Sequence, residues 1–107
     1  MNIKTIHMTI NIQYVHMPTS DAMNELITNK LNKLGKKYDW ILSADVFFKL
    51  ENDSTGKNKL CEMKLEIPGP KLFAKSVETN FEKAASETLK DLERQLKKRK
   101  ETIFNPN

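Results

Sequence analysis

Five basic side chains lie within seven positions near the end of the chain, in the segment LERQLKKRKE. They are Arg94, Lys97, Lys98, Arg99 and Lys100. Ammonium and guanidinium groups at this density can neutralise phosphates or another polyanion. A lysine-rich helix is more often only a solvent-exposed face, so the surrounding charges must decide between the two interpretations.

The net charge of +4 is concentrated in one segment. Residues 83–100 hold seven basic and three acidic residues, while the rest of the chain holds eleven of each. A second basic cluster lies between Leu26 and Tyr38, where no acidic residue occurs. Its members are Lys30, Lys33, Lys36 and Lys37. Exposed helices usually mix both signs to form pairs four residues apart, so this separation of charge favours a polyanionic partner.

Other reactive residue types form no recognisable site. Neither His7 nor His16 has a sequence neighbour at metal-ligand spacing, so both are expected to be surface residues. Alternation predicts that Cys61 points inward as a small buried side chain and is no nucleophile. There is no glycine-rich phosphate loop and no carboxylate pair suited to acid–base work. The chain is therefore expected to be no enzyme and to need neither cofactor nor metal.

The size of the chain allows one domain, and we expect residues 1–107 to form it. No apolar run approaches the roughly 18 residues of a membrane span. The first ten residues alternate apolar and polar side chains and lack the apolar centre of a signal peptide. With a single cysteine, the chain can form no internal disulfide, so a cytoplasmic location is expected.

Hydrophobic periodicity predicts the order βαβββα. A period of two predicts strands at residues 3–14, about 41–50, 60–67 and about 72–77. A period of 3.6 predicts helices at residues 21–38, capped by Ser20, and at about 80–102. The first two strands are expected to be parallel through a right-handed crossover, and the later neighbours antiparallel. Both helices should cover one face of a four-stranded mixed sheet, which makes the fold α+β.

The basic residues of the second helix are expected to form a ridge opposite its apolar stripe. The members of this ridge are Lys83, Lys90, Arg94 and Lys97. Glu93 lies off the ridge and is expected not to neutralise it, whereas Glu87 and Glu101 are expected to dilute its charge somewhat. Arg99 falls in line with the apolar stripe. The last turns are therefore expected to protrude beyond the sheet and to be basic all round.

Two aromatic side chains are predicted on the open face of the sheet, away from the helices. Phe47 lies beside Lys49, and Phe73 lies beside Lys75. Aromatic rings next to lysines can stack nucleic-acid bases. Alternatively, the two rings pack on each other across the sheet, and this interpretation is favoured because cross-strand aromatic pairs stabilise sheets by themselves.

The helical segments resemble a known family over nearly the whole chain. SDAMNELITNKLNKLGKKYDWI is similar to the pattern T-D-A-L…K-L-x-K-L-x-x-x-F-D-x-I, and LERQLKKRKE resembles the ending L-x-R-Q-L-x-K-x-K-E. Both patterns are typical of the ribosome hibernation promoting factor family, also called sigma-54 modulation or ribosomal subunit interface proteins. This chain resembles the short form. The resemblance implies two roughly parallel helices on one sheet face, as in double-stranded-RNA-binding domains.

The resemblance also implies a partner and a site. Members of the family sit in the messenger and transfer RNA cleft of the small ribosomal subunit and contact ribosomal RNA through both helices. The basic positions that match are Lys30, Lys33, Lys36, Arg94, Lys98 and Lys100. Glu82 and Asp91 depart from the family pattern in the early part of the second helix.

Charge and resemblance together predict a ribosomal RNA-binding factor that inhibits translation by occupying its site. The predicted RNA-binding residues are Lys30, Lys33, Lys36, Lys37, Lys90, Arg94, Lys97, Lys98, Arg99 and Lys100. Two alternatives stay open. One is a general double-stranded RNA-binding module, and the other is a protein-interaction module for an acidic partner.

Overall fold

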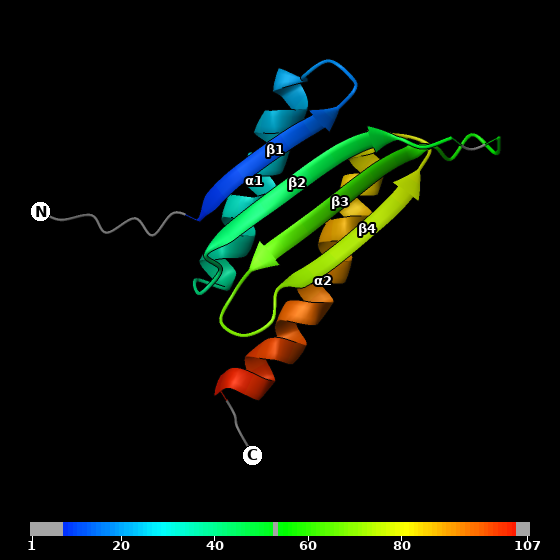
Figure 1. Ribbon diagram of the computed structural model, residues 1–107. Helices are drawn as coiled ribbons and strands as arrows, with labels where there is room; N and C mark the ends of the chain where they lie inside the picture. The colour runs from blue at the N-terminus through cyan, green and yellow to red at the C-terminus, as the bar shows by residue number, and fades with distance from the viewer. Residues whose placement is uncertain (1–7, 53, 105–107) are drawn as a thin grey trace, which may run out of the picture.

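The computed structural model describes residues 8–52 and 54–104, and it has the predicted order of elements (Figure 1). The strands are β1 (Thr9–Val15), β2 (Ser43–Leu50), β3 (Lys59–Glu66) and β4 (Leu72–Glu78). The helices are α1 (Asp21–Lys37) and α2 (Phe81–Phe104). Residues 3–7 of the first predicted strand, with His7 among them, lie outside the described residues.

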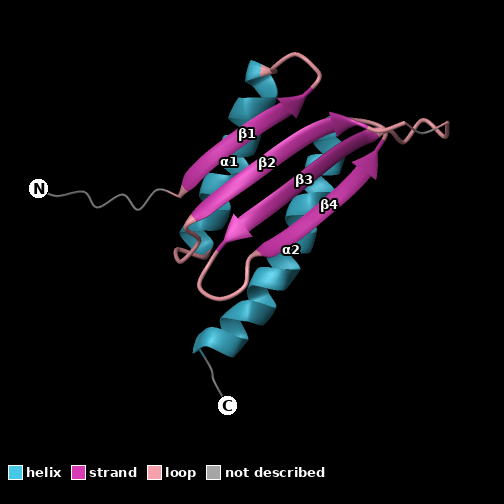
Figure 2. Ribbon diagram, viewed as in Figure 1, coloured by secondary structure: helices cyan, strands magenta, loops and turns pink. Residues whose placement is uncertain are grey.

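The four strands form one mixed sheet in the order β1-β2-β3-β4. β1 runs parallel to β2, with Thr9 opposite Ser43, and the two later pairs are antiparallel. Both helices lie on the same face of the sheet and run roughly parallel to each other (Figure 2). The predicted α+β architecture is thereby confirmed, and within residues 8–52 and 54–104 the other face of the sheet carries no helix.

The core lies between the sheet and the two helices. The sheet contributes the alternate inward side chains of its strands, with Val46, Phe48, Met63 and Leu65 fully buried. The helices contribute Ile27 and Leu31 from α1 and Leu92 and Leu96 from α2. Truncating a buried leucine to alanine typically costs about 2–5 kcal/mol, so these contacts hold both helices firmly on the sheet.

Local contacts fix the ends of α1. The Ser20 hydroxyl accepts a hydrogen bond from the Met23 amide at 3.1 Å and caps the helix as predicted. Near the other end, Gly35 packs closely on Met8, because a Cβ at this position would lie 2.5 Å from the terminal methyl of Met8 and would require that flexible side chain to shift. Tyr38 is buried just past the helix and contacts the Trp40 ring edge-to-face.

α2 begins at a cap and ends in an extension beyond the sheet (Figure 1). The Asn80 side-chain oxygen accepts from the Lys83 amide at 2.7 Å. In the extension, Arg99 Nη1 donates to the carbonyls of Pro68 at 3.2 Å and Pro70 at 2.9 Å. Arg99 therefore ties the extension to the β3–β4 turn. The last turns are expected to be basic all round, but Arg99 is half-buried and its guanidinium is engaged by this turn.

Candidate nucleic-acid interface

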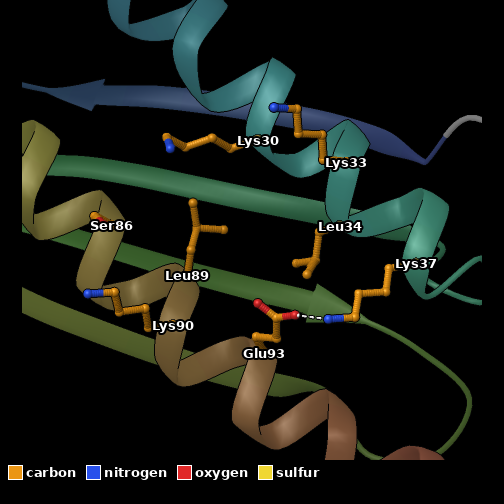
Figure 3. A pocket seen from close by; sticks show the side chains of 8 residues that line it. All are labelled: Lys30, Lys33, Leu34, Lys37, Ser86, Leu89, Lys90 and Glu93. Atoms are coloured by element: carbon orange, nitrogen blue, oxygen red, sulfur yellow. Dashed lines mark hydrogen bonds and ion pairs between the residues drawn. The ribbon is translucent and has the colours of Figure 1, made fainter.

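A hollow of about 310 Å³ separates the exposed sides of the two helices (Figure 3). Its α1 wall consists of Lys30, Lys33, Leu34 and Lys37. Its α2 wall consists of Ser86, Leu89, Lys90 and Glu93. Four lysines thus surround the hollow, and two leucines form its floor. This arrangement can hold an anionic group between the helices.

A second hollow continues the first along the helices towards the beginning of α2. It shares Lys30, Ser86 and Lys90 with the first hollow and extends to Asn80 and Lys83. Glu82 and Glu87 also line it. The two hollows therefore adjoin each other, and together they are called here the interhelical groove.

The α1 wall follows from the helical period. Lys30, Lys33 and Lys37 recur at spacings of three and four residues, so they lie on one side of the helix. Leu31 and Leu34 are buried against the core and fix the rotation of the helix. Lys30 and Lys33 are exposed, and neither makes an ion pair within the described part of the chain. Both ammonium groups are therefore available to a ligand.

Lys37 is already engaged across the groove. Its ammonium group lies 2.6 Å from the Glu93 carboxylate, so the two side chains link α1 to α2 (Figure 3). The hydrogen bond and the negative charge of Glu93 raise the pKa of Lys37. This pair does not contradict the expectation that Glu93 leaves the ridge of α2 unneutralised, because Lys37 belongs to the other helix. The pair itself was not predicted.

The ridge of α2 also has acidic neighbours. Lys90 lies 3.8 Å from Glu87, and Arg94 lies 3.8 Å from Asp91. These distances exceed those of good hydrogen bonds, and exposed pairs of this kind contribute only about 0–1 kcal/mol. The ridge is therefore less positive than its basic residues alone indicate, but Lys90 and Arg94 can exchange these partners for a phosphate.

The ten predicted RNA-binding residues fall into three groups. Those that line the interhelical groove are Lys30, Lys33, Lys37 and Lys90. Exposed residues that do not line it are Lys36, Arg94, Lys97, Lys98 and Lys100. Arg99 contacts the β3–β4 turn instead. The prediction omitted Ser86, which lies one turn before Lys90; this spacing of four residues on one helix face was the signal available in the sequence.

The remaining candidates for chemistry are structural. Cys61 is buried as predicted, and burial raises the pKa of its thiol to about 12, which suppresses the reactive thiolate. Among the described residues, no group of histidine, cysteine and acidic side chains is arranged to hold a metal ion. Within the same residues, no helix is both long and apolar enough to cross a membrane.

The predicted packing of Phe47 on Phe73 is wrong. Both residues lie on the open face, but β3 separates their strands. Phe47 lies opposite Glu62, and Phe73 lies opposite Lys64. Strands separated by a third strand are about 10 Å apart, so the two rings form no cross-strand pair.

Comparison with known proteins gives a consistent result. The family model described as "Sigma 54 modulation protein / S30EA ribosomal protein" matches residues 10–103. The fold is similar to that of a ribosomal subunit interface protein from Coxiella burnetii, with a TM-score of 0.77 and 24% identity. That match covers 87% of this chain and 98% of the other.

A second solved structure agrees with the first. The N-terminal domain of Thermus thermophilus Protein Y matches with a TM-score of 0.72 and 24% identity, over 85% of this chain and 98% of the other. No sequence among the curated proteins matches the chain significantly.

Proposed function

The chain belongs to the sigma 54 modulation protein / S30EA ribosomal protein family, and from this membership we propose that it is a ribosome hibernation factor. It binds ribosomal RNA of the small subunit in the cleft for messenger and transfer RNA. By occupying this cleft in the cytoplasm it inhibits translation. Residues 1–107 act as one ribosome-binding domain, and no bond is made or broken.

The observation that carries this proposal is the interhelical groove with its lysines. Lys30 and Lys33 on α1 and Lys90 on α2 line the groove from its two walls. RNA phosphates can enter such a groove because ammonium groups on both walls neutralise them and release bound counterions. The exposed cations further along α2 extend the same positive surface.

Phosphate contacts of this kind fix the orientation of a protein on RNA without reading base sequence. Selectivity for one ribosomal site therefore comes from shape. The sheet and the buried leucines hold the helices at a fixed separation, so the two rows of lysines match phosphates only where the RNA backbone has the corresponding spacing. A rigid two-row site of this type suits folded ribosomal RNA.

The proposal is tested by sucrose-gradient co-sedimentation with purified small subunits, followed by chemical footprinting of the ribosomal RNA. We expect stoichiometric binding and a single protected region in the cleft. Protection spread over many duplex regions would instead indicate a general double-stranded RNA binder. Retention of the protein on nuclease-treated ribosomal proteins would indicate a protein-interaction module.

A further inference from the structure

The open face of the sheet carries a second basic surface, on the edge strand β4. Phe73 and Lys75 alternate with the buried Leu72 and Ala74, so both point away from the helices, and Lys71 lies directly before the strand. All three are exposed, and Phe73 keeps 46% of its surface accessible. Successive members of this row lie about 7 Å apart along the strand.

A further lysine joins the row from the neighbouring strand. Lys64 of β3 lies directly opposite Phe73. Lys64 also lies diagonal to Phe47 of β2, because Phe47 is opposite Glu62, which precedes Lys64 by two residues on β3. Lys64 therefore stands between two aromatic side chains. We call the surface formed by Lys64, Lys71, Phe73 and Lys75 the β4 strip.

The lysines of the β4 strip are available to a ligand. None of the three makes an ion pair within the described residues. Carboxylates occur on the inner strands, where Glu62 lies opposite Lys75 and Asp45 lies opposite Lys64. The Asp45 carboxylate accepts a hydrogen bond from the Asn11 amide at 3.2 Å. The positive charge therefore increases towards the β4 edge.

The exposure of Phe73 has no structural explanation in the fold. Its ring is not paired with Phe47, and Phe73 belongs neither to the core nor to the partly buried side chains packed against it. Its backbone is nevertheless held in place, because Gln95 of α2 donates a hydrogen bond to the Phe73 carbonyl at 3.0 Å. A fixed, accessible ring surrounded by unpaired lysines has the properties of a base-stacking platform.

We propose that the β4 strip binds single-stranded RNA, with a base stacked on Phe73 and phosphates neutralised by Lys64, Lys71 and Lys75. The strip lies on the face of the sheet opposite to the helices, so it is separate from the interhelical groove (Figure 2). The molecule can therefore hold two RNA segments at once, one on each face. This second site goes beyond the function proposed above.

The test compares Phe73→Ala with the parent chain, using fluorescence anisotropy of a fluorescein-labelled short oligouridylate. Loss of one stacked base should weaken binding about 5- to 150-fold. Phe73→Tyr keeps the ring and should retain binding. The matched control is Leu50→Ala, because Leu50 is 50% exposed but lies outside the β4 strip. Thermal unfolding of Phe73→Ala should match that of the control.

Photo-crosslinking with an oligonucleotide that contains 4-thiouridine locates the base directly. Trypsin cleaves after Lys71 and Lys75, so the expected crosslinked peptide is LFAK, residues 72–75. Equal affinity of Phe73→Ala and the parent, or crosslinks confined to α1 and α2, would overturn the proposal. A Phe73→Ala variant that loses ribosome association but keeps oligouridylate affinity would also overturn it, in favour of a protein partner.

Discussion

At the scale of the residue, Glu93 has the most direct influence on the proposed interface. Its carboxylate contacts Lys37 at 2.6 Å and lines the groove together with Lys30, Lys33 and Lys90. A carboxylate among lysines occupies the kind of position that a phosphate oxygen takes in the proposed complex. Bound RNA must therefore compete with Glu93 for Lys37.

Glu93→Gln is expected to bind the small subunit more tightly than the parent, by up to about tenfold, or 1.4 kcal/mol. The change removes a negative charge from the groove and leaves Lys37 free for one further phosphate. The plot of log K against log salt should become steeper by roughly 0.7 to 0.9. Affinity measured over a range of salt concentrations checks both expectations.

Glu25→Gln is the matched control, because it makes the same charge change at an exposed position of α1 that does not line the groove. It should leave the salt dependence unchanged. If Glu93→Gln binds more weakly than the parent, the pair with Lys37 is needed to hold the helices at their separation, and the competition described here does not occur.

Two contacts could not be predicted from the sequence at this scale, namely the ion pair of Glu93 and the hydrogen bonds of Arg99. The helical period gives the side of a helix on which a residue lies, but not which residue of another element faces it. Glu93 meets a lysine 56 positions away, and Arg99 meets carbonyls 29 and 31 positions away. Such contacts depend on how the helices sit on the sheet, and local spacing contains no information about that.

At the scale of the element, the ridge of α2 is tested by the triple change Lys90→Glu, Arg94→Glu and Lys97→Glu. All three side chains are exposed, and glutamate favours helices about as well as lysine or arginine. New repulsion with Glu87 and Asp91 costs only about 0.2–0.5 kcal/mol per pair. Circular dichroism should therefore stay native-like, while co-sedimentation with small subunits is lost.

The control for the ridge makes the same change of net charge in the β2–β3 hairpin, at Lys49, Lys57 and Lys59. These residues lie on strands or in their connection, away from the groove. Their reversal should weaken ribosome binding far less than reversal of the ridge. Equal losses in the two triple variants would mean that only overall charge matters and that the ridge has no special role.

The elements themselves were predictable because each has a strong hydrophobic period. The bounds of α1 differ from the prediction by one residue, and α2 continues two residues further than expected. The error about Phe47 and Phe73 has a different origin. A period of two assigns a residue to a face of the sheet, whereas lateral neighbours follow from strand order and register. The assignment of Phe47 and Phe73 to the open face was therefore correct, but the residues that lie beside each of them on that face were not predicted.

At the scale of the whole molecule, two basic surfaces lie on opposite sides of one sheet. The interhelical groove lies on the helical side, and the β4 strip lies on the open side. The core between them consists of side chains from both layers, so the separation of the two surfaces is fixed by the fold. The basic surface on the helical side could be predicted from the sequence through the family resemblance. The β4 strip could be recognised only once the order of the strands was known.

The central claim is that the lysines of the groove bind RNA phosphates, and a salt titration of small-subunit affinity tests it most directly. Each neutralised phosphate contributes a slope of roughly −0.7 to −0.9 in log K against log salt. Lys33→Gln, in the groove, should therefore give a slope shallower by about that amount. Lys57→Gln, an exposed lysine of the β2–β3 connection, should give the slope of the parent. Equal slopes for all three proteins, or a flat titration of the parent, would contradict the claim.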